Sequence, residues 1–134
     1  MRFMKYLLDT HILLWSFFET KKLSKRVENI LLDENNEIYY SPVNLWEISI
    51  KYGLGKLKLN GLTPEELFKE IEKSFFVCKN IESKVMATVY KLPVIHKDPF
   101  DRFLIWEAIS NNFSLICADE AIKEYASMNL DIVF

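Results

Sequence analysis

The 134-residue chain has only three glycines, four prolines and two cysteines, and it lacks any apolar run of membrane-spanning length. The scarcity of glycine and proline, with no internal repeat, argues against linkers and low-complexity tracts. Cys78 and Cys117 lie in apolar runs without metal-ligand spacing, so we expect two buried free thiols in a reducing cytoplasm. The apolar run 12–18 is too short to span a bilayer, and no small-residue cleavage site follows it, so neither a membrane segment nor a signal peptide is expected.

The balance of charge and hydrophobicity limits the class of protein. The formal net charge is −2, which excludes a generic basic nucleic-acid binder that coats phosphates with lysine and arginine. Half of the residues are hydrophobic and 14% are aromatic, which argues against disorder. We therefore expect a single domain, residues 1–134, with a core of its own.

Strand-like and helix-like patterns alternate along the chain, which predicts an α/β fold: a three-layer α/β/α sandwich with a mostly parallel central sheet. The expected strands cover residues 4–9, 37–40, 75–81, 115–118 and 131–134. The expected helices cover residues 10–19, 24–34, 42–52, 64–74, 82–92, 99–112 and 120–125. Ligands of such folds bind outside the carboxyl ends of the strands.

Three aspartates fall at the ends of predicted elements. Asp9 and Asp119 each close a strand, and Asp101 lies in the first turn of the helix that Asp98 caps. Each has a structural alternative, because a carboxylate suits a helix cap or the positive end of a helix dipole.

Glu47 is the least ordinary acid of the chain. It lies within a predicted apolar stripe of one helix, formed by Val43, Trp46, Ile50 and Leu54. The alternative is a salt bridge to Lys51, four residues further along the helix. An inward carboxylate needs a partner. If the four elements pack together, their carboxylates meet at one sheet edge, where a hard divalent cation would neutralise them. This pattern favours metal-dependent chemistry on phosphate esters.

Four motifs, in order and at fitting spacing, resemble those of the PIN-domain family, and within it the VapC-type toxin ribonucleases. They are 7–15 (LLDTHILLW), 41–51 (SPVNLWEISIK) with 55–57 (GKL) following, 96–102 (HKDPFDR) and 115–119 (LICAD). The resemblance covers nearly the whole chain and implies a PIN-like fold. One departure is Cys117, where the family often has a threonine, and a thiol is the weaker hydrogen-bond partner.

The resemblance implies a metal-dependent endoribonuclease, with Asp9, Glu47, Asp101 and Asp119 as the acid quartet that holds Mg²⁺ or Mn²⁺. Within this quartet, Asp119 would bind the metal directly or act through a water. Supporting residues would be Thr10, Ser41 and Asn44, and candidate phosphate contacts are Lys51, Lys56, Lys58, Lys97 and Arg102. The implied partners are RNA, a small antitoxin protein that covers the active site, and a second copy of the chain in a homodimer.

Two other functions compete with this interpretation. A phosphatase of the haloacid-dehalogenase type would need a second aspartate two residues after the first, where this chain has His11. A catalytically silent PIN-like domain that binds RNA or protein would not need the complete acid quartet. The sequence favours the nuclease over both.

Overall fold

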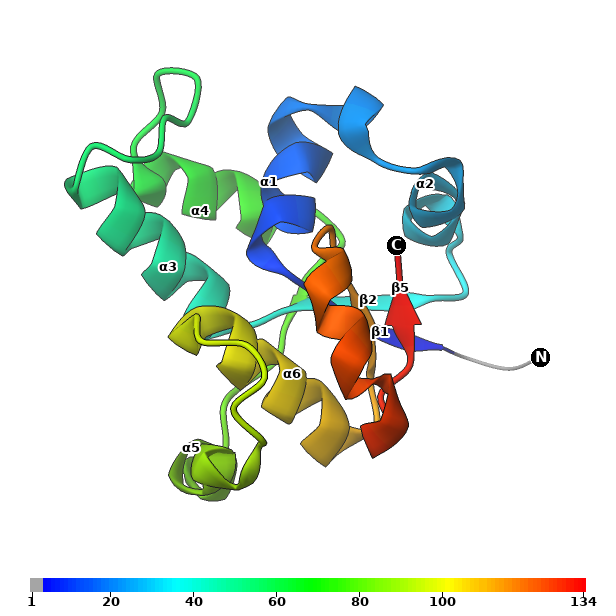
Figure 1. Ribbon diagram of the computed structural model, residues 1–134. Coiled ribbons are helices and arrows are strands. Elements are labelled where there is room, and N and C mark those ends of the chain that lie inside the picture. Colours follow the sequence, from blue (N-terminus) through cyan, green and yellow to red (C-terminus); the bar gives the residue numbers. More distant parts are fainter. Residues whose placement is uncertain (1–3) are drawn as a thin grey trace.

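The computed structural model describes residues 4–134, which form a five-stranded sheet between two layers of helices (Figure 1). All neighbouring strands are parallel, in the order β3-β2-β1-β4-β5. The strands are β1 (Lys5–Leu8), β2 (Glu37–Tyr40), β3 (Val77–Cys78), β4 (Ser114–Ile116) and β5 (Ile132–Val133). The predicted three-layer α/β/α sandwich with a parallel sheet is confirmed.

The helices begin largely where the sequence places their caps. Ser24, Ser41, Thr63 and Asp98 each accept a backbone N–H at the start of a helix, which satisfies a donor that the helix leaves free. The α-helices are α1 (Thr10–Phe18), α2 (Lys25–Leu32), α3 (Pro42–Gly53), α4 (Pro64–Lys73), α5 (Ser83–Thr88) and α6 (Pro99–Asn111). The 3₁₀ helices are η1 (Thr20–Lys22), η2 (Val89–Lys91) and η3 (Glu120–Met128).

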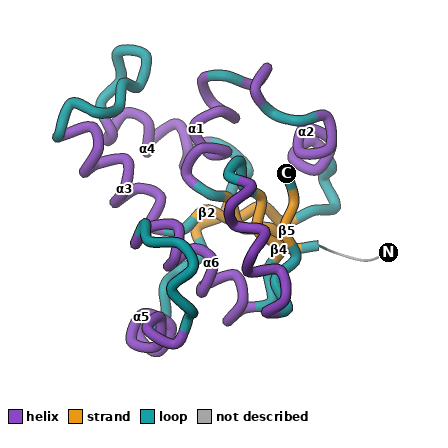
Figure 2. Tube along the Cα trace, viewed as in Figure 1, coloured by secondary structure: helices purple, strands orange, loops and turns teal. Residues whose placement is uncertain are grey.

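Successive residues of β1 point to opposite faces of the sheet and enter two separate cores. Tyr6 and Leu8 pack with apolar residues of α1, α2 and α4, whereas Leu7 packs with those of α5, α6 and η3. Helix α3 contributes to both cores, through Ile48 to the first and Val43 to the second. Figure 2 shows the strands enclosed by these helices. Burial on both faces explains why the strand sequences read as continuous apolar runs.

Several predicted elements are shorter in the structure. The strand expected at 75–81 is reduced to β3, an edge strand that pairs with β2 alone. The helix expected at 82–92 divides into α5 and η2, and the helix expected at 120–125 is the 3₁₀ helix η3. Strand β4 ends before Ala118, because the Ala118 N–H donates to the Asp9 carboxylate and leaves the sheet.

The parallel arrangement brings the carboxyl ends of β1, β2 and β4 to one edge of the sheet. Asp9 follows β1, Ser41 follows β2, and Asp119 lies three residues beyond β4. The candidate site is built at this edge.

Candidate active site

Asp9 is the buried anchor of the site. Its Oδ1 accepts the N–H of Ile12 at 2.8 Å, as a helix cap does, and its Oδ2 accepts the N–H of Ala118 at 3.0 Å. The residue is 3% exposed. Burial raises the pKa of Asp9 to about 6, against the lowering by these two N–H groups, and the nearby Glu47 raises it further. Capping and site formation are therefore joint roles of one carboxylate.

Glu47 is buried as expected, but on a different face of α3 from the one predicted. The buried residues of α3 are Val43, Asn44, Glu47 and Ile48. Trp46, placed by the sequence in the buried stripe, is 57% exposed and stacks edge-on against Phe100, with ring centroids 5.0 Å apart. The prediction of that stripe was wrong, because α3 lies at the end of the sheet and leaves one side uncovered.

Glu47 is both buried and paired with Lys51. Its Oε2 forms an ion pair with Lys51 Nζ, one turn along α3. Its Oε1 is buried and has no hydrogen-bond partner among residues 4–134. A buried carboxylate oxygen without a partner is costly. This oxygen is therefore a free ligand position inside the site.

Thr10, Ser41 and Asn44 form a buried network that fixes α3 against β1. The Asn44 side chain donates to the Leu8 carbonyl at 3.2 Å and to the Thr10 hydroxyl at 3.0 Å. Its Oδ1 accepts the Ser41 N–H at 2.7 Å, completing a capping box at the start of α3. Because Thr10 follows Asp9 and Asn44 lies three residues before Glu47, the network sets the position of one acid relative to the other.

Asp101 enters from the first turn of α6. Asp98 caps this helix by accepting the N–H groups of Phe100 and Asp101, at 2.8 and 3.0 Å. Burial raises the pKa of Asp101 to about 6, and the charges of Asp98, Glu47 and Asp9 raise it further, in that order. The mutual effects of Asp9, Glu47 and Asp101 indicate that carboxylates from β1, α3 and α6 share one electrostatic environment.

Asp119 stands at the open side of the site. Its side chain is 50% exposed, and the Ala121 N–H that it accepts holds its pKa below the ordinary value. His96 Nε2 lies 3.4 Å from Asp119 Oδ2 and 3.4 Å from Asp101 Oδ2. One ligand atom from each of His96, Asp101 and Asp119 falls within 4.8 Å of the others. The imidazole thus joins the exposed acid to the buried ones.

His96 is a site residue to which sequence reasoning gave no role. Its Nδ1 accepts the N–H of Asp98 at 3.2 Å, so in the neutral ring Nε2 carries the proton, donates to Asp119 and also faces Asp101. A metal-binding histidine usually donates a hydrogen bond from its second nitrogen, whereas here that nitrogen accepts one. His96 is therefore placed as a donor rather than as a metal ligand. The sequence signal that could have indicated this role is the position of His96, two residues before the helix cap Asp98.

Two side chains from other elements hold the loop that carries His96. The buried Tyr125 hydroxyl accepts the N–H groups of Ile95 and His96, at 3.1 and 2.8 Å, and donates to the Pro93 carbonyl at 3.0 Å. The Arg102 guanidinium donates to the carbonyls of Leu92, Pro93 and His96. Nothing in the sequence pattern of η3 marked Tyr125 for this role.

The basic residues predicted to contact phosphate differ in their availability. Lys51 is paired with Glu47, and Arg102 is engaged with loop carbonyls that a phosphate would have to replace. The other three lie on the surface: Lys56, Lys58 and Lys97. Their contacts with phosphate remain predictions.

The cysteines are both free, but only one is buried. Cys117 is 1% exposed, and burial followed by the charges of Asp9, Asp119 and Asp101 raises the pKa of its thiol above the ordinary range. Its Sγ lies 3.9 Å from the Asp119 carbonyl, where a threonine hydroxyl would bond more strongly. Cys78, predicted to be buried, is half-buried, because the edge strand β3 is covered on one side only.

A second buried acid lies outside the predicted set. Glu107 of α6 is 1% exposed, and neither carboxylate oxygen meets a partner of good hydrogen-bond geometry among residues 4–134. Burial raises the pKa of Glu107 to about 7, although the Ser41 hydroxyl is close enough to lower it somewhat. We interpret Glu107 as a packing residue of α6, whose burial favours the neutral form of its carboxyl group.

The donor set suits a hard divalent cation. Asp9, Glu47, Asp101 and Asp119 offer carboxylate oxygens, the ligands that Mg²⁺ and Mn²⁺ prefer. The unpartnered Glu47 Oε1 and the raised pKa values of Asp9 and Asp101 are the features expected of acids that need a cation between them. The residues therefore fit the predicted metal.

Comparisons with known proteins agree with this geometry. The model of the PIN domain family matches residues 6–128. No curated protein gives a significant match. Within residues 4–134, no helix combines the length and apolar character that crossing a membrane requires.

Among solved structures, VapBC2 from Rickettsia felis, bound to a DNA fragment from its promoter, is 22% identical with a TM-score of 0.67, covering 96% of this chain and 97% of that one. VapBC-1 from nontypeable Haemophilus influenzae is 19% identical with a TM-score of 0.64, covering 96% of both chains. A toxin–antitoxin complex from Klebsiella pneumoniae is 19% identical with a TM-score of 0.60, again covering 96% of both. At these identities the likeness establishes a shared fold.

Proposed function

This chain belongs to the PIN domain family, and from that premise we propose that it is a metal-dependent endoribonuclease, the toxin of a toxin–antitoxin pair. The observation that carries the proposal is the buried, unpartnered Glu47 Oε1 beside Asp9 and Asp101, two acids with raised pKa values. A domain that only binds RNA or protein has no need to assemble such acids. The structural neighbours that are toxin–antitoxin complexes support the biological role.

In this proposal Asp9, Glu47 and Asp101 hold the divalent cation, and Asp119 binds it directly or through a water. When bound, the cation supplies positive charge to a bridging phosphate and lowers the pKa of water for in-line attack. The chain's own residues fix the carboxylates: the N–H groups of Ile12 and Ala118 orient Asp9, and the Asn44 network orients α3. No serine or cysteine nucleophile is required, and the buried, protonated Cys117 is unsuited to be one.

The RNA backbone would reach the site from its open side, where Asp119 is half-exposed. Lys97 lies next to the Asp98 cap and Lys56 follows α3, so both are candidates to contact flanking phosphates. His96 Nε2–H faces the same side between Asp101 and Asp119. It is suited to hold Asp119 in place or to donate to a phosphate oxygen.

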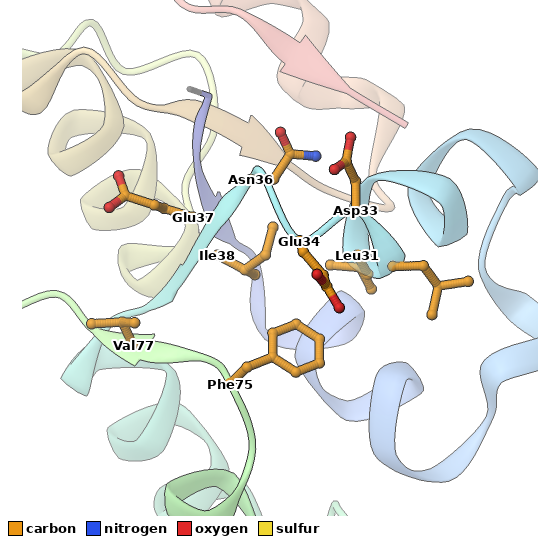
Figure 3. A pocket seen from close by; sticks show the side chains of 9 residues that line it. Leu31, Asp33, Glu34, Asn36, Glu37, Ile38, Phe75 and Val77 are labelled. Carbon is orange, nitrogen blue, oxygen red and sulfur yellow. The ribbon is translucent and has the colours of Figure 1, made fainter. Parts of the chain in front are cut away.

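We expect the antitoxin to be anchored near the amino end of β2, at the end of the sheet opposite the candidate site. A cavity of about 460 Å³ lies beside the start of β2, where Ile38, Phe75 and Val77 form an apolar floor (Figure 3). A second cavity of about 290 Å³ adjoins it and shares Leu31, Leu32 and Phe75. Leu32 is 70% exposed and Phe75 is 66% exposed. We name this continuous surface the α2–β3 groove.

The α2–β3 groove has an acidic rim, formed by Asp33, Glu34 and Glu37. Its chemistry fits one kind of occupant: an amphipathic segment of the antitoxin with large apolar side chains flanked by lysine or arginine. From this anchor, the remainder of the antitoxin would extend to cover the acids. The proposed homodimer would instead cover exposed apolar residues beside α3 and α5, among them Trp46, Leu54, Met86 and Tyr90.

Growth of a bacterial host tests the proposal. Induced expression of the chain should arrest growth, and Asp101→Asn should abolish the arrest while the protein accumulates to a similar level. Coexpression of the small protein encoded beside it should also restore growth. Free growth with abundant wild-type protein would contradict the toxin role and favour the silent binding domain.

A further inference from the structure

Lys51 is the cation that accompanies Glu47 in the metal-free protein. The two residues lie one turn apart on α3, and their ion pair is the one that Glu47 makes within residues 4–134. The Glu47 side chain is 4% exposed, whereas that of Lys51 is 35% exposed. The lysine therefore extends from the surface into the site, with its ammonium group on a buried carboxylate.

The acidic groups near the Lys51 ammonium group include two of the acids proposed to bind the metal, Glu47 and Asp101. The charges of Asp98, which caps α6, and of Asp101, in its first turn, act on the Lys51 ammonium group in addition to that of Glu47. The guanidinium of Arg102, the next basic group of α6, is directed instead to the carbonyls of the 92–96 loop. The neutralisation of Glu47 without metal thus falls to Lys51.

We propose that Lys51 is a displaceable counter-ion: it neutralises Glu47 through Oε2 while the centre is free of metal, and a divalent cation bound at the unpartnered Oε1 takes over this neutralisation and releases the ammonium group. The inference rests on the proposed function for the identity of the metal-binding acids. Once displaced, the ammonium group remains tethered by α3 at the rim of the site. There it is available to a phosphate of the RNA, which links metal binding to substrate binding.

Competition between two cations for one carboxylate gives reciprocal effects. Lys51→Met keeps most of the aliphatic stem but removes the charge. Without metal, the variant should be less stable than wild type, because Glu47 is then buried without a counter-ion. With metal, the same variant should bind the ion more tightly, because no ammonium group competes with the ion for the charge of Glu47. A purely structural lysine would instead affect the stability of both states equally.

The experiment uses Mn²⁺ alone as the probe, with no RNA. The dissociation constant is measured from the electron paramagnetic resonance signal of free Mn²⁺, and the midpoint of thermal unfolding is measured with and without Mn²⁺. For Lys51→Met we expect the dissociation constant to fall about fivefold or more. We also expect the unfolding midpoint to drop without Mn²⁺ and to return towards the wild-type value at saturation.

Two controls distinguish exchange from other effects. Lys97→Met removes an exposed charge near the site and should change Mn²⁺ affinity much less. An equal gain in affinity in Lys97→Met would overturn the inference, because the general field of nearby lysines would then explain the effect of Lys51→Met. The double variant Glu47→Gln, Lys51→Met should recover metal-free stability, because the buried charge is gone, while binding Mn²⁺ poorly. This second variant keeps the test decisive if the single variant folds badly.

Two further results would overturn the inference: unchanged Mn²⁺ affinity in Lys51→Met, or an equal loss of thermal stability with and without the ion. Failure of the proposed function looks different. In that case wild-type protein would bind Mn²⁺ no better than Asp101→Asn, before any question about Lys51 arises.

Discussion

The Oδ2 atom of Asp9 accepts the backbone N–H of Ala118 at 3.0 Å, across 109 positions of the chain. The carboxylate that would bind metal therefore also ends β4 and fixes the segment leading to Asp119. Asp9 and Asp119 are coupled through the backbone, and a change at Asp9 disturbs more than one ligand.

This coupling predicts different effects for two substitutions of the acid quartet. Asp9→Ala leaves the N–H groups of Ile12 and Ala118 without their acceptor, and should lower the free energy of unfolding by about 1–3 kcal/mol. Asp101→Asn removes a charge that is repelled by Asp98, Glu47 and Asp9, so the metal-free protein should be as stable as wild type or more so. Urea unfolding without metal measures both. Equal destabilisation by the two variants would contradict this account.

The pH dependence of stability follows from raised pKa values. Asp9 and Asp101 have pKa values of about 6 and Glu107 of about 7, all above those of the unfolded chain. The folded state then binds more protons, so the contribution of these groups is fully present below about pH 4 and is lost as the pH rises through about 6 to 7. Lowering the pH from about 8 to about 5 should stabilise the metal-free protein.

Bound metal should remove the part of the pH dependence of stability that is due to Asp9 and Asp101. Saturating Mg²⁺ competes with protons for Asp9 and Asp101 and leaves the part due to Glu107, which Glu107→Gln should abolish. Unfolding midpoints across the pH range, with and without Mg²⁺, measure both parts. A metal-free protein that is steadily less stable as the pH falls from 8 to 5 would contradict the assignment.

His96 should act as a donor that positions the aspartates. Glutamine can place an N–H near the position of Nε2, whereas alanine cannot. We expect His96→Ala to reduce activity by about 10- to 100-fold and His96→Gln to reduce it less. Bound Mn²⁺ should show no nitrogen coupling in pulsed electron paramagnetic resonance. Clear coupling, lost in both variants, would instead make His96 a metal ligand.

The α2–β3 groove yields a prediction independent of catalysis. Leu32→Arg places a positive charge among Asp33, Glu34 and Glu37, where the proposed basic segment would bind. The variant should remain toxic and cleave RNA, but should no longer copurify with the neighbouring small protein. Tyr90→Arg changes a similarly exposed apolar residue (75% exposed) on the surface proposed for the homodimer; it is the matched control and should still copurify with the small protein, whatever its effect on the homodimer. Retention of the complex by both variants would place the antitoxin elsewhere.

The sequence predicted the sheet layers, most of the helix starts and the burial of Glu47, because caps and apolar runs are local signals. It misplaced Trp46, because which side of α3 is covered depends on its position at the end of the sheet. It also missed Tyr125 and the role of His96. Their hydrogen bonds join η3 to a loop some 30 residues earlier, and no local pattern encodes such a contact.

The short length of β3 could not be predicted from local patterns for the same reason. Phe75 and Phe76 have strong strand character, but their rings pack edge-on, with centroids 5.2 Å apart, before β3 begins. Phe76 also packs against Phe17 of α1, with ring centroids 5.9 Å apart. Tertiary packing, which the sequence did not reveal, decides the length of this strand.

The most direct test of the central claim is cleavage of bulk tRNA by purified, antitoxin-free protein in the presence of Mg²⁺, Mn²⁺ or EDTA. Asp101→Asn is the matched variant, because it is expected to fold as well as wild type. We predict metal-dependent cleavage by wild-type protein, and none by the variant or in EDTA. Cleavage that persists in EDTA or in Asp101→Asn would contradict a nuclease site built on these acids.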